Sequence, residues 1–201
     1  MKLRKVGHVR HLCFDLENRP LAYWYDGETT SQITAFGWKW SDEPEPHTLL
    51  LHADGRFEND TGRKISNKAA HAYFREVLCS AGLIFGHNIR RHDLPIFQAW
   101  LLRHELAPLP RLLTSDTLRD YPRRGGLSAS LENLAAMYDL GGKKFSMSQP
   151  MWEKANQLAP DGIALARTRV ASDVVLQARL RDRLIDLGLL GAPQMWGPKL
   201  A

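Results

Sequence analysis

The segment from His11 to Glu17, His-Leu-Cys-Phe-Asp-Leu-Glu, most constrains what this chain can fold into. Successive side chains of a strand point to opposite faces, so Phe14 and Leu16 share one face while Asp15 and Glu17 share the other. Two adjacent carboxylates inside a sheet repel each other and lose hydration, and a bound divalent cation is the usual compensation. An edge strand with a solvated polar face is the alternative, and this segment alone does not decide between the two.

The order of the remaining segments predicts a mixed α/β domain. Strands are expected first, as an antiparallel meander over residues 11–17, 32–40 and 47–52, followed by a polar surface loop over residues 53–64. Helices then alternate with two short parallel strands, at residues 83–86 and 111–114. The helices are expected at residues 66–81, 92–104, 130–140, 149–157 and about 161–187. The fold class is therefore α/β, with a central mixed sheet of three antiparallel and two parallel strands flanked by helices.

Length and composition limit the function classes. The 201 residues suit a single domain over residues 1–201, with a loose tail from about residue 190. A net charge of +5 favours a polyanionic partner. We expect no membrane association, because no apolar run approaches the roughly 20 residues that cross a bilayer. The two cysteines read as small core residues in a reducing compartment, which favours the cytoplasm.

A second polar cluster follows the predicted strand that ends at Gly86. His87, Asn88, His92 and Asp93 lie at the carboxyl end of this strand and at the start of the next helix. A carboxylate in the first helical turn is favoured by the helix dipole, so a plain N-terminal cap is one interpretation of Asp93. Capping explains the Gly-His-Asn cluster less well.

A third carboxylate, Asp173, lies in the middle of the last long helix. Apolar residues flank it at helical spacing, and a carboxylate beside such a stripe is costly unless it is paired. An ion pair with Arg169, one turn earlier on the same face, is the simpler alternative. Acid after base is the poorer orientation for such a pair, which is worth only a few tenths of a kcal/mol (about 0.2–0.5).

The ordered set of segments resembles the DEDD, or DnaQ-like, 3′–5′ exonuclease superfamily, which has a ribonuclease H-like fold. The resemblance spans residues 10–180 and rests on Phe14-Asp-Leu-Glu, Gly86-His-Asn-x3-His-Asp and Ala171-Ser-Asp-Val. Asp116-Thr-Leu and Ser130-Leu-Glu-Asn-Leu-Ala are similar to stretches common between the second and third motifs. The chain is most similar to stand-alone exonuclease-like proteins of phages and their hosts, which implies a bacterial or phage-infected host cytoplasm.

The resemblance implies a role for each acid. Asp15, Glu17, Asp93 and Asp173 would be catalytic and would hold two Mg²⁺ or Mn²⁺ ions, with Asp15 between them and Asp93 reaching the second. Two such ions, about 3.5–4 Å apart, clamp a scissile phosphate. The implied reaction is hydrolysis of single-stranded nucleic acid from the 3′ end, with DNA preferred. Replication or repair proteins are possible partners.

One departure from the family pattern bears on activity. The superfamily carries a Tyr four residues or a His five residues before the last Asp, to position the attacking water. Here these places hold Arg169 and Thr168, and a guanidinium stays protonated. Three alternatives stay open: the metal alone supports a slower enzyme, His92 or His87 substitutes, or the chain binds nucleic acid or a replication or repair partner with little turnover. An RNA-processing exoribonuclease is a further alternative with the same chemistry.

Several residues are expected to contact the substrate. His87, Asn88 and His92 adjoin the predicted site, Arg169 has a planar fork that suits a phosphate, and Trp24 could stack on a base. Three basic pairs could follow a phosphate backbone and make binding salt-dependent. They are Arg90-Arg91, Arg123-Arg124 and Lys143-Lys144.

Overall fold

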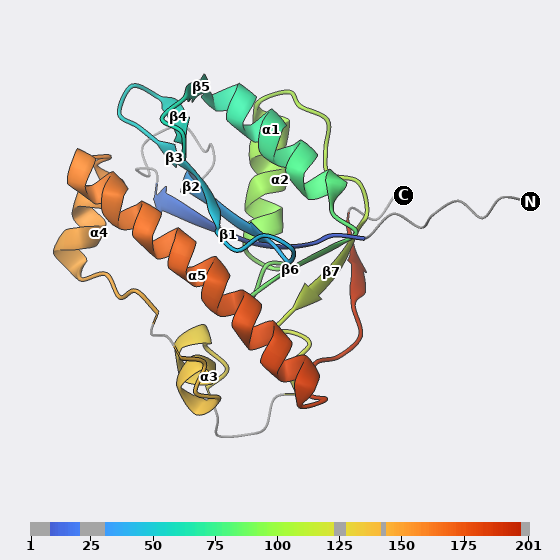
Figure 1. The fold of residues 1–201 in the computed structure, drawn as a ribbon. Coiled ribbons are helices and arrows are strands. Elements are labelled where there is room, and N and C mark those ends of the chain that lie inside the picture. The colour runs from blue at the N-terminus through green and yellow to red at the C-terminus, as the bar shows by residue number, and fades with distance from the viewer. Residues whose placement is uncertain (1–8, 21–30, 123–127, 142–143, 198–201) are drawn as a thin grey trace, which may run out of the picture.

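The computed structural model describes residues 9–20, 31–122, 128–141 and 144–197. These residues form an eight-stranded sheet in the order β5-β4-β3-β2-β1-β6-β7-β8, with helices on both faces (Figure 1). The strands are β1 (His11–Pro20), β2 (Ser31–Trp40), β3 (His47–Leu51), β4 (Arg56–Asn59), β5 (Lys64–Ser66), β6 (Leu83–Gly86), β7 (Leu112–Asp116) and β8 (Gln194–Trp196). The helices are α1 (Asn67–Ser80), α2 (Asp93–Arg103), α3 (Leu131–Met137), α4 (Gln149–Asn156) and α5 (Pro160–Asp186).

The sheet is mixed. Strands β1 to β5 form an antiparallel meander, β6 runs parallel to β1, and β7 runs parallel to β6. This arrangement confirms the predicted α/β fold class and is compatible with a ribonuclease H-like fold.

Three strands were not predicted from the sequence. Strands β4 and β5 form a hairpin within residues 53–66, most of which the sequence predicted to be a surface loop. Strand β8 pairs antiparallel with β7, where a loose tail was predicted. All three are only three or four residues long, which is too short for an alternating apolar pattern to mark them.

One face of the sheet carries an aromatic core beneath α1 and α2. Leu12, Phe14 and Leu16 of β1 point to this face, as the strand period predicts. The ring of Phe14 lies 5.9 Å from that of Phe74 on α1, and the ring of Phe36 lies 4.6 Å from the same ring. Phe97 of α2 packs edge-on against Phe36. Cys13, Asp15 and Glu17, which precede a bulge in β1, therefore point to the opposite face.

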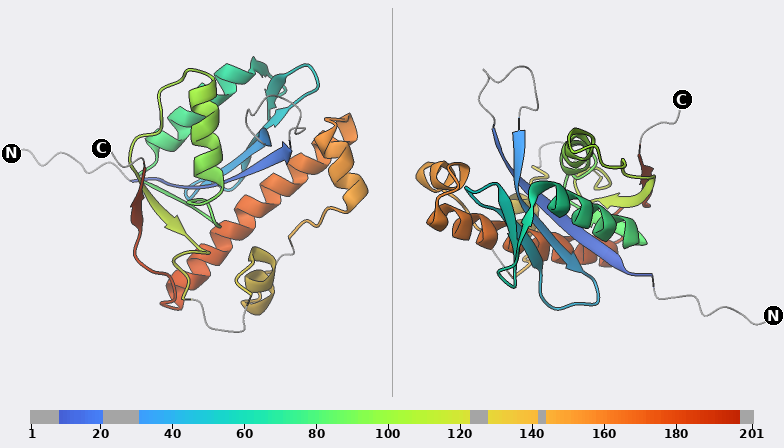
Figure 2. Two further views of the ribbon diagram at one scale, coloured as in Figure 1. Left: turned by 180° about the vertical axis from the view of Figure 1, so that it is seen from behind. Right: turned by 90° about the horizontal axis from the view of Figure 1, so that it is seen from above.

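Helix α5 covers that opposite face, and α4 packs beside it (Figure 2). Gly37 on β2 pairs with Asp15 on β1. A Cβ atom at Gly37 would lie 2.6 Å from Cγ2 and 3.0 Å from the carbonyl oxygen of Val170, so only glycine admits the helix this closely. The approach brings the following turn of α5, which carries Asp173, over β1.

Helix α5 is the longest described helix, with 27 residues. It buries Val170 and Val174 against the sheet and Leu180 and Leu184 against α3, while Asp182 on the outer side is exposed. Neither α5 nor any other helix in the described ranges combines the length and apolarity that a membrane span requires.

Candidate metal centre

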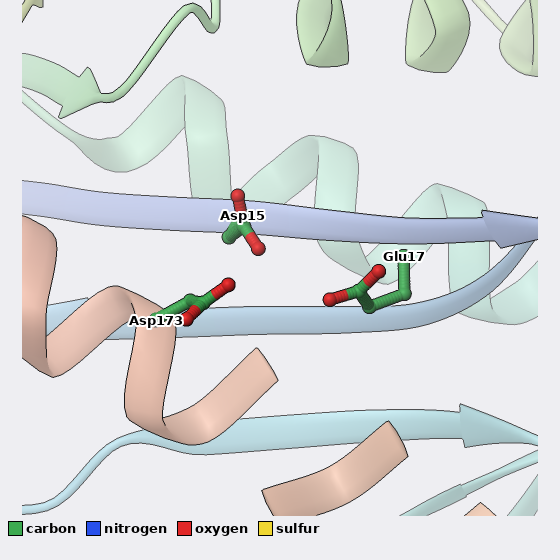
Figure 3. Close-up of side chains that lie close together, drawn as sticks. All are labelled: Asp15, Glu17 and Asp173. Atoms are coloured by element: carbon green, nitrogen blue, oxygen red, sulfur yellow. The ribbon is translucent and has the colours of Figure 1, made fainter. Parts of the chain in front are cut away.

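Three carboxylates from two distant segments meet between β1 and α5. Figure 3 shows Asp15 and Glu17 on β1 and Asp173 on α5 pointing toward one another. One oxygen of each lies within 4.8 Å of one oxygen of each of the others. The strand period places the first two on one face, and the contact at Gly37 brings the helix that carries the third.

Burial makes this cluster costly to ionise. Burial raises the pKa of Asp15 well above its ordinary value, and the charges of Asp93, Glu17 and Asp173 raise it further. Burial also raises the pKa of Glu17 to about 7, although Arg169 opposes the shift. The pKa of Asp173 is raised by burial against the opposing charges of Lys144 and Arg169. A divalent cation would stabilise the ionised forms and release protons as it binds.

Asp173 carries a buried oxygen that lacks a partner. Its residue exposure is 2 %. Its Oδ1 atom has no hydrogen-bond partner among the described residues, whereas Oδ2 faces Lys144 Nζ at 3.5 Å and Arg169 Nη2 at 3.6 Å. Buried polar atoms are almost always satisfied, so this oxygen points to a missing ligand. The donor set fits a hard cation such as Mg²⁺ or Mn²⁺.

A cavity of about 180 Å³ adjoins the three carboxylates. Its lining joins β1, the β6–α2 connection, the start of α2, α3, the segment between α3 and α4, and α5. The lining residues are Asp15, Leu16, Glu17, His87, Asn88, His92, Asp93, Leu131, Lys144, Arg169, Asp173 and Gln177.

Asp93, the fourth predicted ligand, lies beside the cluster but outside the converging three. Its Oδ1 atom accepts the backbone N–H of Leu16 at 3.1 Å, because the pairing of β1 with β6 stops at Cys13 and Phe85. Its Oδ2 atom lies 3.6 Å from Nδ1 of His92. Asp93 therefore ties α2 to β1, which differs from the plain helix cap considered from the sequence. Its role as a ligand stays a prediction.

Gln177 was not predicted and connects three parts of the site. Its Nε2 donates to Oδ1 of Asp15 at 3.0 Å, and its Oε1 accepts the backbone N–H of His87 at 3.2 Å. The residue is buried. Its position one turn after Asp173 on the same face of α5 was the available signal in the sequence.

Arg169 lies inside the acidic site. Its Nε donates to Oε1 of Glu17 at 2.9 Å, and its Nη1 donates to the carbonyl oxygen of Phe145 at 2.7 Å. The ion pair with Asp173 that the helical spacing suggested is present as well, at 3.6 Å. Thr168 is exposed and donates its hydroxyl to Ala164 within α5, so it lies away from the cavity.

His87, Asn88 and His92 line the cavity, as the sequence suggested. Burial lowers the pKa of His87 to about 4, so this ring is neutral at physiological pH. The interaction with Asp93 raises the pKa of His92, whose side chain is 47 % exposed. Asn88 adopts a positive φ of 68°, and its Oδ1 accepts a hydrogen bond from Arg119 at 2.9 Å.

The three basic pairs that were predicted to follow a phosphate backbone have different surroundings in the structure. Arg90 forms a buried ion pair with Asp120 at 2.7 Å and donates to Thr114, so its guanidinium serves the packing of the β6–α2 connection rather than an external phosphate. Lys144 faces the cavity. The other predicted contacts Trp24, Arg123, Arg124 and Lys143 lie outside the described residues.

Comparisons with known proteins give a likeness of fold. No protein-family model matches the chain, and comparison with curated proteins gave no match. Among solved structures, the chain is similar to the family B DNA polymerase from the hyperthermophilic archaeon Pyrobaculum calidifontis, with a TM-score of 0.60 and 13% sequence identity. The match covers 89% of this chain and 25% of the polymerase, so the chain spans about a quarter of that protein's length.

Proposed function

We propose that the chain is a metal-dependent 3′–5′ exonuclease of the DEDD type, acting on single-stranded nucleic acid with DNA preferred. The convergence of Asp15, Glu17 and Asp173, with one oxygen left unpartnered, carries the proposal. The fold shared with a DNA polymerase supports it, because that protein also acts on nucleic acid. The order of the three sequence motifs supports the exonuclease class in particular.

The carboxylates would hold a divalent ion, which when bound polarises a phosphodiester and stabilises the departing oxygen. Neighbouring residues orient the carboxylate of Asp15 and the amide of Asn88. Gln177 holds Asp15 through Oδ1, so this carboxylate cannot turn away from the cavity. Arg119 engages the oxygen of Asn88, which presents the amide nitrogen as a donor for a phosphate or base oxygen.

His92 is the best-placed general base in this proposal. It lines the cavity, is half exposed, and has a pKa raised by its interaction with Asp93, so it can take up a proton from the attacking water. His87 is a much weaker base, with a pKa of about 4, and its Nδ1 lies 2.9 Å from Oγ1 of Thr117. Arg169 cannot act as a base.

A second candidate function is a nucleic-acid-binding protein, or one that recruits a replication or repair partner, with little turnover. The contacts of Arg169 and Lys144 with Glu17 and Asp173 favour it, because two cations already balance part of the acidic charge. The unpartnered oxygen of Asp173 favours the enzyme.

The decisive experiment is hydrolysis of 5′-labelled single-stranded DNA and RNA of one sequence, each with Mn²⁺, Mg²⁺ or EDTA. We expect a ladder of products shortened from the 3′ end, present only with metal and faster on DNA. A faster reaction on RNA would identify an exoribonuclease. Metal-dependent binding without cleavage would favour the binding protein and contradict the proposal.

Substitution of the acids provides the matching genetic test. Asp15→Ala and Asp173→Ala should each lower the rate by at least ~10³-fold, because each removes a negative oxygen ligand from the ion. Asp182→Asn on the exposed side of α5 is the matched control and should keep the wild-type rate. Hydrolysis retained in both acid variants, with circular dichroism unchanged, would exclude this cluster as the catalytic site.

A further inference from the structure

Arg169 is enclosed within the acidic site. Its guanidinium donates to Glu17 at 2.9 Å and lies 3.6 Å from Asp173, so it contacts two of the three converging carboxylates. The Trp152 ring packs against it, with the guanidinium carbon 5.1 Å from the ring centre. The bond to the Phe145 carbonyl completes this enclosure. Arg169 is therefore held as a fixed positive charge within the site, with its side chain only 14 % exposed.

The carboxylate oxygens of Asp15 and Asp93 that a second ion would need are already engaged in other contacts. An acid that bridges two ions needs lone pairs free for both, and Oδ1 of Asp15 already uses one of its lone pairs to accept from Gln177. Asp93, the predicted ligand of the second ion, uses Oδ1 to accept from Leu16 and turns Oδ2 toward His92. Among the residues that the structure describes, the oxygens that converge within 4.8 Å make up one set of three, which suits one ion.

The charge balance agrees with this ligand count. The three converging carboxylates and Arg169 together leave two negative charges when the acids are ionised. Including the negative charge of Asp93 and the positive charge of Lys144 leaves the net charge of the site unchanged. One divalent ion neutralises it, whereas two would leave an excess of positive charge beside partly buried groups, which is unfavourable.

We propose that this site takes one divalent ion where the resemblance implies two, and that the Arg169 guanidinium supplies the second positive charge facing the scissile phosphate. The proposal rests on the proposed nuclease function. A guanidinium suits the role, because it stays charged and its fork matches phosphate oxygens. Arg169 would then be a substrate-binding residue that also limits metal stoichiometry.

Mn²⁺ stoichiometry tests this directly. Purified protein is titrated with Mn²⁺ at pH 8, and free Mn²⁺ is counted by its paramagnetic resonance signal. We expect one tightly bound ion per chain in the wild type and in Arg169→Lys, which keeps the charge. We expect two in Arg169→Gln, because the loss of the guanidinium frees Oε1 of Glu17 as a ligand and makes the acidic site more negative. Arg167→Gln, which removes one charge from the same helix at a site that contacts Thr48 and Asp60, should bind one.

The outcomes separate the two proposals. Two tight ions in the wild type, or one in a folded Arg169→Gln variant, would overturn the role of Arg169 and leave the nuclease proposal standing. Two ions in Arg167→Gln would also overturn it, because any loss of charge would then suffice. No tight ion in any variant would overturn the metal site, and the proposed function with it. If Arg169→Gln fails to fold, by circular dichroism, two ions in Arg169→Lys would still contradict the proposal.

Discussion

Asp15 shows at the scale of one residue how the site opposes the stability of the fold. It lies on a central strand beside the charges of Asp93, Glu17 and Asp173, and its pKa is raised mainly by burial. In the unfolded chain this carboxyl loses its proton near its ordinary pKa, whereas the folded chain retains it to higher pH. Folding is therefore opposed increasingly as the pH rises through that interval.

Asp15→Asn should therefore stabilise the metal-free protein at pH 8 and leave it almost unchanged at pH 4. Asn keeps an oxygen for the hydrogen bond from Gln177 but carries no charge. Thermal unfolding in EDTA should show a melting temperature several degrees higher at pH 8, since 1 kcal/mol corresponds to roughly 2–4 °C in a domain of this size. Equal melting temperatures of the wild type and Asp15→Asn at pH 8 would mean that the Asp15 carboxylate does not destabilise the fold.

At the scale of elements, the contact between Gly37 and α5 sets the distance of Asp173 from β1. The helix lies against the backbone of β2 because no side chain separates them. Val170 stands at this contact and Asp173 follows one turn later, so a shift of the helix at Val170 moves the third carboxylate.

Gly37→Ala should accordingly weaken both the fold and the metal site. The added Cβ would lie 2.6 Å from Cγ2 of Val170, and overpacking of this kind costs about 1–3 kcal/mol. We expect a lower urea midpoint and weaker Mn²⁺ binding. Val170→Ala in the same chain removes the closer of the two obstacles and should restore part of both quantities. If the double variant recovers neither stability nor Mn²⁺ binding, the contact between Gly37 and Val170 does not control the distance of Asp173 from β1.

At the scale of the molecule, β8 joins the carboxyl-terminal segment to the cavity's surroundings. Its backbone pairs with β7, and the carbonyl oxygen of Gln194 accepts the Thr114 hydroxyl at 2.8 Å. Trp196 Nε1 donates to the carbonyl oxygen of Arg90, which lies between Asn88 and His92. Strand β8 therefore covers the edge of the sheet and supports the connection that lines the cavity.

Removal of residues 192–201 should lower the melting temperature and promote association of chains through the uncovered edge of β7. Dynamic light scattering and thermal unfolding, compared with the full chain at equal concentration, test this prediction. Trp196→Ala, which keeps the strand backbone, should lower the melting temperature less and leave the chain dispersed. Equal stability of the truncated and full chains would show that β8 has no structural role.

The sequence predicted much of this arrangement because the relevant patterns are local. Alternation put Asp15 and Glu17 on one face. The helices expected from residues 66 and 130 begin at Asn67 and Leu131, where the side chains of Ser66 and Ser130 cap them. Other features depend on tertiary contacts that a local pattern does not encode. Gln177 acts through a residue 162 positions away, and Asp93 bonds to Leu16, 77 positions away. Polar residues with distant partners look the same in sequence as polar residues in solvent.

The long separation of the acids has a consequence during synthesis. Arg169 meets Glu17 across 152 residues of sequence, so the site needs a late helix docked on the first strand. A nascent chain that has emerged only as far as β7 carries Asp15 and Glu17 but not Asp173. It therefore holds no complete acidic centre while it remains beside the ribosome and its message. In the proposed nuclease, hydrolytic capacity would therefore arise only after α5 has emerged and docked on β1.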